Sequence, residues 1–197
     1  MTHPRLLALV ALALLVPAAG GVTFAAYTAT NANGGDRVEA GSVKLSDNGD
    51  GSSMLSLSAA VPGDTTSACI KVSYDGTLPA TVRLHGTTTG SGLDAYLDLK
   101  VTRGVYSPTA PAFKSCANFQ PDGTDYVGAG NGVIYNGTLQ GYPDDYASGL
   151  VDPLSGSPES WSTGEAHVYK LEVTLQSNFA AQNKDATQTF RWEARNQ

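Results

Sequence analysis

The sequence is poor in charge, in cysteine and in helix-forming patterns, and each shortage excludes a class of protein. Charged residues make up 15% of the 197 positions, against about 25% in an average soluble protein. With 12 basic and 18 acidic residues, the net charge is −6. This charge offers neither the basic stripe of a nucleic-acid-binding protein nor an attraction to an anionic membrane surface. Beyond the first 20 residues, the helical spacing of Ala, Leu, Glu and Lys that a helical bundle requires is also missing.

What the chain has instead is glycine, hydroxyl-bearing residues and a repeated alternation of apolar and polar side chains. The alternating segments are 43–46, 55–58, 70–74, 82–85, 97–102, 169–176 and 190–195. Turn-forming sequences separate several of them, among them Asp47–Gly51, Pro62-Gly63-Asp64 and Asp75-Gly76. One apolar and one polar face per strand is typical of antiparallel sheets that pack on a shared core. We therefore predict an all-β protein, either a β-sandwich or a barrel.

The middle of the chain is less regular. Residues 103–164 are rich in Gly, Pro, Asp and Tyr, and we expect long loops there around one strand near Val133–Leu139. Helix is expected to be minor, with at most a turn or two in Leu93–Leu99 and in Tyr142–Ser148. No linker and no internal repeat divides the chain, which favours a single domain.

The first 26 residues have the parts of a secretory signal peptide. Arg5 is followed by Leu6–Val16, an unbroken apolar run of 11 residues, and then by the small residues of the segment 17–21. A basic start, an apolar stretch of about 7–15 residues and a small-residue exit are the features that an export signal needs. We predict that residues 1–26 are a signal peptide, which a signal peptidase removes.

The predicted cleavage lies at Ala25 or Ala26, before Tyr27. The alternative is a retained membrane anchor, but the apolar run reaches the roughly 20 residues of a span only if Val22–Ala26 are included. No cysteine stands at the site where a lipoprotein would be acylated. We therefore expect no stable membrane span after cleavage, and a protein that is secreted and is extracellular or on the cell surface.

The only two cysteines are Cys69 and Cys116. An even number of cysteines in an exported chain predicts a disulfide. Closing the loop between these two positions would contribute about 4 kcal/mol by the chain-entropy estimate. Two isolated cysteines without close spacing lack the partners of a zinc site.

The sequence contains no motif that would mark a catalytic centre. Neither HExxH nor GxSxG occurs, which removes the common signatures of zinc peptidases and of α/β-hydrolases. Glu165 and His167 would share one face of a strand and could supply two metal ligands, but no third ligand is visible. The acidic loops lack the spacing of an EF-hand calcium site. We therefore predict no catalytic, cofactor-binding or metal-binding residues, no cofactor and no enzymatic activity.

In their order along the chain, several short motifs resemble the TasA/camelysin family of exported bacterial proteins. The similarity is greatest to actinobacterial members with a SipW-type signal peptide. The similar segments are Val22–Tyr27, Ala40–Leu45, Pro62-Gly63-Asp64, Asp75–Ala80, Tyr135–Leu139, Tyr169–Leu175, Ala181-Gln182 and Phe190–Ala194. The two cysteines and the shorter chain depart from the best-known fibre-forming members.

The resemblance implies an antiparallel jelly-roll-like β-sandwich and a structural role in extracellular fibres or biofilm matrix. It also implies that subunits assemble with copies of themselves, each donating an N-terminal strand to the open sheet edge of the next. The donor would begin with Tyr27, Thr28, Ala29 and Thr30, in a flexible segment of residues 27–36. Residues 37–197 would then form the single sandwich domain.

Two other functions remain open at this point. Camelysin-like members are described as secreted metallopeptidases, so the resemblance also permits proteolysis. The third alternative is a monomeric β-sandwich that binds a partner at the cell surface. A freely disordered N-terminus is likewise the alternative to a donated strand.

Overall fold

The structure is a computed structural model, and it describes residues 28–32, 43, 45–49, 52–151, 153–154, 157–158 and 160–196. The predicted signal peptide of residues 1–26 and its cleavage site at Ala25, Ala26 and Tyr27 lie outside the described residues. In the part of the chain that is described, no helix is long and apolar enough to cross a membrane.

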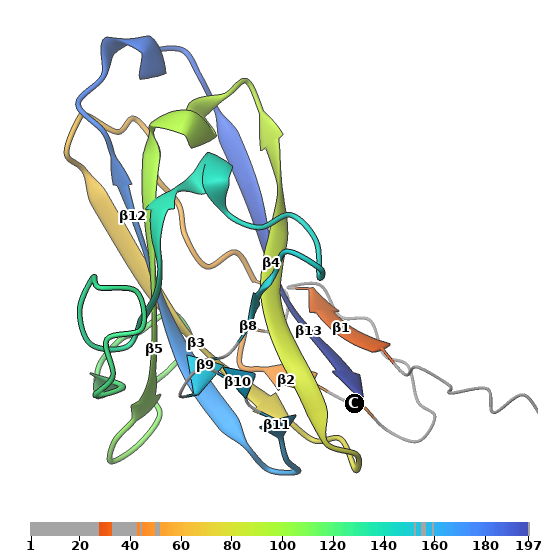
Figure 1. Cartoon of the computed structure of the whole chain (residues 1–197). Coiled ribbons are helices and arrows are strands. Elements are labelled where there is room, and N and C mark those ends of the chain that lie inside the picture. Colours follow the sequence, from red (N-terminus) through yellow and green to blue (C-terminus); the bar gives the residue numbers. More distant parts are fainter. Residues whose placement is uncertain are drawn as a thin grey trace, which may run out of the picture.

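The described chain folds into two antiparallel β-sheets that face each other (Figure 1). One sheet has the order β1 (Thr28–Ala32), β13 (Ala186–Asn196), β4 (Ala80–Gly90) and β11 (Ser160–Trp161), with β8 (Leu150–Val151) also paired to β4. The other has the order β2 (Leu45–Asp47), β3 (Thr65–Tyr74), β12 (Ala166–Leu175), β5 (Leu97–Tyr106) and β6 (Phe119–Pro121), with β7 (Val133–Thr138) also on β5. The remaining elements are a small hairpin of β9 (Pro153–Leu154) and β10 (Ser157–Pro158) and the 3-10 helices η1 (Leu93–Tyr96), η2 (Leu139–Gly141) and η3 (Phe179–Ala181).

The connections between the sheets are those of a jelly roll. Eight of the strands define this topology. Their spatial order is β1-β13-β4-β8 in one sheet and β3-β12-β5-β7 in the other. Among these eight strands, only β5 and β7 follow each other within one sheet, and every other step along the chain crosses to the opposite sheet. This double Greek key is the jelly-roll arrangement, so the predicted all-β sandwich of jelly-roll type is confirmed.

The alternation in the sequence explains how the core forms. Leu97, Leu99 and Val101 of β5 are buried, whereas the two residues that lie between them are more exposed. On the neighbouring strand β12, Leu171 lies directly opposite Val101 and is also buried. Since side chains alternate between the faces of a strand, each strand presents one apolar row to the facing sheet. Trp192 of β13 is 3% exposed and lies in this shared core.

One local prediction is wrong. The alternation around Leu55 and Leu57 predicts a strand, but residues 52–60 form none; we call this segment the strap. Met54, Leu55 and Leu57 of the strap are all partly buried against the core. A regular strand cannot turn the neighbours Met54 and Leu55 to the same side, so covering the core takes precedence over strand pairing here. In Tyr142–Ser148, where at most a turn or two of helix is expected, the chain forms bends and a turn.

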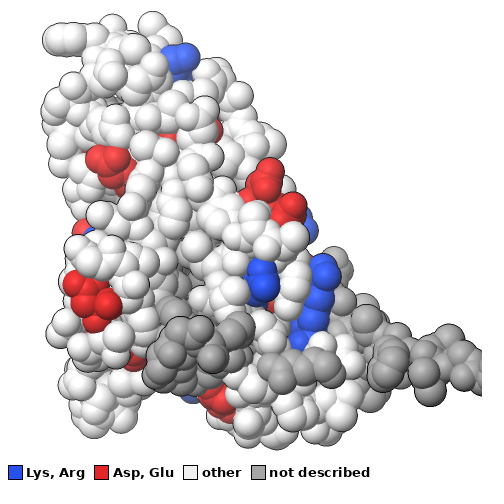
Figure 2. Space-filling view, viewed as in Figure 1, with Lys and Arg blue, Asp and Glu red and all other residues white. Residues whose placement is uncertain are grey.

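The surface has few charges, as the composition predicts. On the face shown in Figure 2, most of the surface belongs to uncharged residues, and the acidic and basic side chains lie in separate small groups. Several large apolar side chains also reach the surface, including Val61, Val127 and Phe179, which is 88% exposed. The face in Figure 2 therefore carries no extended patch of one charge sign.

Candidate functional site: the β13 edge and the pocket beside it

Strand β13 has one fully paired side and one side that is paired over only part of its length. On one side it pairs antiparallel with β4 from Ala186 to Asn196. On the other side it pairs with β1, from Thr28 opposite Arg195 to Ala32 opposite Arg191. The stretch Ala186–Phe190 has no strand partner on that side among the described residues.

The predicted assembly residues fall at this edge. Thr28, Ala29 and Thr30 belong to β1, whereas Tyr27 lies outside the described residues. In the structure β1 lies on β13 of its own chain (Figure 1). Donation of β1 to a second copy therefore stays a prediction. The structure identifies β13 as the strand that would receive the donor.

The outer face of the same sheet is held by an ionic cluster. The buried Glu193 accepts hydrogen bonds from Arg195 at 2.9 Å and lies 3.1 Å from the His85 ring nitrogen Nε2. The Arg195 guanidinium stacks 3.7 Å above the centre of the Tyr146 ring. Through these contacts the turn that contains Tyr146 is fastened to β13 and β4. The cluster stabilises the strand that carries the edge.

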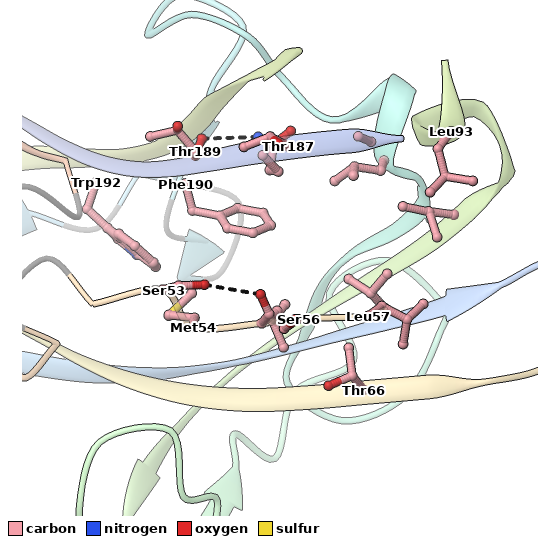
Figure 3. A pocket seen from close by; sticks show the side chains of 16 residues that line it. Ser53, Met54, Ser56, Leu57, Thr66, Leu93, Thr187, Thr189, Phe190 and Trp192 are labelled. Atoms are coloured by element: carbon pink, nitrogen blue, oxygen red, sulfur yellow. Dashed lines mark hydrogen bonds between the residues drawn. The ribbon is translucent and has the colours of Figure 1, made fainter. Parts of the chain in front are cut away.

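A pocket of about 520 Å³ lies beside the unpaired part of the β13 edge. Its walls are the strap, residues 186–190 and 192 of β13, and apolar residues of β5, β12, η1 and η2. Figure 3 shows the Phe190 and Trp192 side chains on one side of this space, with Met54 and Leu57 of the strap opposite. None of the lining side chains carries a charge. The volume lies within the range of about 300–1,000 Å³ that is common for small-molecule sites.

Glu165 and His167, the two candidate metal ligands, lie elsewhere, at one end of the sandwich. The His167 nitrogen Nε2 is 2.9 Å from Glu165 and 3.0 Å from the Arg103 guanidinium, which itself pairs with Asp122 at 2.6 Å. A guanidinium cation beside the imidazole nitrogen opposes the binding of a metal cation at that atom. No group of three or more His, Cys, Asp and Glu side chains that could hold a metal is found among the described residues.

Arg103 is the residue in this cluster that the sequence analysis missed. It follows Leu97, Leu99 and Val101 in the same alternation and is only 4% exposed. Its position in the inward-facing row was the signal, because a charged residue is seldom fully buried without a partner. The Trp161 ring packs at 4.5 Å against His167 and is fully buried. The cluster therefore closes this end of the core.

The predicted disulfide between Cys69 and Cys116 is confirmed, with 5.1 Å between the two Cα atoms. Cys69 is fully buried on β3, and its backbone N–H donates to the carbonyl oxygen of Lys114 at 3.3 Å. The bond therefore attaches the loop after β5 to the outer side of β3. It fixes one edge of the second sheet.

No protein-family model matches the chain, and no curated protein matches it. The fold and the local geometry are therefore the basis for the functional proposal that follows.

Proposed function

We propose that the protein is an exported structural subunit of extracellular fibres or biofilm matrix, and that copies join when β1 of one pairs with β13 of the next. The observation that carries this proposal is the place of β1 in the fold. It is the first described strand of the chain, it ends its sheet, and within that sheet it pairs with β13 alone. Such a terminal element can be exchanged between identical copies while the rest of each copy keeps its contacts.

The energetics of the edge support exchange. Without β1, the backbone groups along Arg191–Arg195 would lose their ladder partners, and each hydrogen bond contributes about 0.5–1.5 kcal/mol net. A strand from a neighbouring copy would restore the same bonds. The choice between the two partners therefore depends on the protein concentration relative to the effective concentration of the chain's own strand.

The unpaired part of the edge also lacks the usual protection against association. Soluble proteins often guard an edge strand with lysine or other charged side chains. The stretch Ala186–Phe190 contains no charged residue. The low charge content of the sequence thus coincides with an edge that has no strand partner among the described residues.

The test uses two alanines that face each other across this edge, Ala29 and Ala194. We expect a mixture of two purified single variants, Ala29→Cys and Ala194→Cys, to form disulfide-linked pairs under mild oxidation. Efficient linkage of the two different variants is expected when β1 of one copy pairs with β13 of another, because this pairing holds the two cysteines opposite each other. A chain that carries both substitutions should form a ladder of linked oligomers on a non-reducing gel.

Ala80→Cys provides the matched control for Ala194→Cys. Ala80 is an equally buried alanine, but it lies on β4, on the far side of β13. The distance across two strands is about 9–10 Å, beyond the Cα separation that a disulfide spans. A mixture of Ala29→Cys and Ala80→Cys should stay unlinked. If the double variant closes only within single chains and the first mixture also stays unlinked, the protein is a self-paired monomer and strand donation is wrong.

A further inference from the structure

The pocket beside β13 extends along that strand, and we call it the channel. Its lining follows β13 from Ala186 to Trp192, which is about 20 Å at about 3.4 Å per residue. The strap residues Ser53–Leu57 form the opposite wall along this length (Figure 3). Leu93, Leu97 and Leu139 contribute further apolar surface. A narrow space between two extended segments suits an extended molecule better than a compact one.

The chemistry of the lining restricts the ligand further. The pocket contains no charged side chain, so a charged group placed inside it would lose its hydration without gaining a partner. The polar side-chain groups of its lining residues are hydroxyls, one amide and the indole N–H of Trp192, for example those of Ser53, Thr66 and Gln188. The Gln188 amide is already engaged, since it donates to the carbonyl oxygen of Thr189 and accepts from Thr88. The interior therefore favours hydrocarbon over any ionised group.

The chain's own N-terminal strand is a poor occupant for this channel. A continuation of β1 along β13 would bring the residues after Ala32 to the unpaired stretch Ala186–Phe190. Those residues read Asn33-Gly34-Gly35-Asp36. Two glycines have no side chain to insert, and the asparagine and aspartate are polar. The apolar volume is therefore not matched to the donor segment of the same protein.

One wall of the channel is attached loosely enough to move. Within residues 53–60, the only hydrogen bond among the described residues runs from Ser53 Oγ to the carbonyl oxygen of Leu55, at 3.2 Å. At its start the strap is also held by the backbone N–H of Ser52, which donates to the carbonyl oxygen of Gly49 at 2.8 Å, and beyond this residue by the packing of Met54, Leu55 and Leu57 against the core. Segments with few backbone hydrogen bonds open at low free-energy cost. Displacement of the strap would admit a ligand without breaking either sheet.

We propose that this channel binds a single unbranched hydrocarbon chain, such as the acyl chain of a lipid. The hydrocarbon chain lies between the strap and β13, against Phe190 and Trp192, and the head group of the lipid stays outside the uncharged interior. Association is driven by the removal of apolar surface from water on both partners. This site adjoins the β1 pairing of the proposed assembly: β1 pairs with Arg191–Arg195, and the channel follows residues 186–190 and 192, so that Trp192 alone belongs to both.

The test uses Trp192 as a reporter that lines the channel. Since the chain contains only two tryptophans, a Trp161→Phe background leaves the fluorescence of Trp192 alone. Bromine quenches tryptophan only at close range, so 12-bromododecan-1-ol should quench Trp192 in a saturable titration with one molecule per chain. In the converse background, Trp192→Phe, the buried Trp161 should not be quenched. Quenching that never saturates, or that affects both tryptophans equally, would overturn the proposal.

Two serines of the strap supply a matched pair of variants. Ser56 lines the channel, whereas Ser58 is equally exposed on the same segment and does not. Ser56→Phe should weaken binding by about tenfold or more, because the ring occupies volume that the chain needs. Ser58→Phe should bind as the parent does. Equal affinity of the two variants, with both shown to be folded by their thermal transitions, would exclude the channel as the site.

A second titration distinguishes whether the hydrocarbon chain comes from free molecules or from a membrane. Vesicles of a phosphatidylcholine that is brominated on its acyl chains should quench Trp192 if the protein can take the chain from a membrane. Quenching by the free alcohol alone assigns the site to free chains, and the proposal holds in either case. If neither probe quenches, the channel does not bind hydrocarbon and the proposal is wrong.

Discussion

Ionised side chains inside this protein are few, and each is paired within a small cluster. Arg103 and Glu193 are both less than a tenth exposed, and each lies in contact with an oppositely charged partner, Asp122 and Arg195 respectively. A buried ion pair adds little net stability, but the loss of one partner leaves an uncompensated charge and costs about 3–5 kcal/mol. The exposed pair Lys170–Glu172 should matter far less, at about 0–1 kcal/mol. At this scale the two clusters fix the ends of the strands and leave the middle of the core apolar.

The stability of the protein at high pH should depend on Tyr142. Burial raises the pKa of this phenol well above its ordinary value, and the nearby Tyr135 acts in the same direction. In the unfolded chain the phenol ionises near pH 10, so the unfolded state loses its proton first. The stabilisation is therefore complete below about pH 10 and is lost as the pH rises further. We expect the unfolding free energy to fall above pH 10 by about 1.4 kcal/mol per pH unit from this group.

The measurement is denaturant unfolding of the parent and of Tyr142→Phe between pH 7 and pH 11. Phenylalanine keeps the ring contacts with Tyr135 and Phe190, whose centres lie 5.3 and 5.5 Å away, and removes the ionisable group. The variant should lose less stability than the parent above pH 10. If the two curves stay parallel over the whole range, the phenol of Tyr142 is not the group responsible.

At the scale of the elements, β4 and β13 approach each other at Gly86 so closely that no side chain fits between them. Gly86 of β4 is opposite Phe190 of β13. A methyl group added to Gly86 would lie 2.1 Å from the carbonyl oxygen of Thr189, which belongs to the backbone and cannot swing away. The absence of a side chain at Gly86 therefore permits the pairing that holds the receiving strand in place.

Gly86→Ala should accordingly destabilise the protein by about 1–3 kcal/mol, the usual cost of forced overpacking. Gly123→Ala is the control, because an added methyl group there meets nothing within 4 Å. Thermal or denaturant unfolding of the two variants provides the comparison. An unchanged Gly86→Ala protein would mean that β4 and β13 can separate slightly without cost.

Among the elements, the strap is one whose backbone structure the sequence pattern does not predict. The strands β5, β12 and β13 follow directly from their alternation, because each buries a row of alternate residues over much of its length. Leu55 and Leu57 show the same alternation, yet they lie in the strap. Alternation reports that side chains are buried on one side, but it does not show whether the backbone also finds a partner strand. The serine-rich composition of the strap gave no further indication.

For the whole molecule, the sequence defined the class of fold better than the candidate site. The jelly-roll order brings β1 and β13, the first and last strands described, side by side, and no local pattern specifies such a pairing. The channel is equally nonlocal, since its walls come from the strap, β13 and several other elements. The disulfide was predictable because only one pairing of two cysteines exists. The partners of Arg103 could not be predicted from the sequence, because they come from distant loops.

The assembly of the whole molecule should depend on the strand at its N-terminal side. We expect the intact protein to form larger particles as its concentration rises, because strand exchange between copies competes with self-pairing. Deletion of Tyr27–Asp36 should abolish this growth, since no donor remains for the β13 edge. A peptide with the sequence of residues 27–36 should bind the shortened protein and raise its melting temperature. Light scattering and thermal unfolding measure the two effects.

A peptide that carries Ala29→Pro and Thr30→Pro is the matched control for this rescue. Proline has no backbone N–H and therefore cannot donate to the ladder with β13. Of two adjacent residues in an edge strand, one directs its N–H toward the partner, so the pair of substitutions removes a donor whichever residue faces β13. The same two substitutions in the intact chain should keep it from assembling, while the core that Trp192 and Leu171 share stays folded. Particle growth that persists undiminished after the deletion would show that β1 is not the joining element.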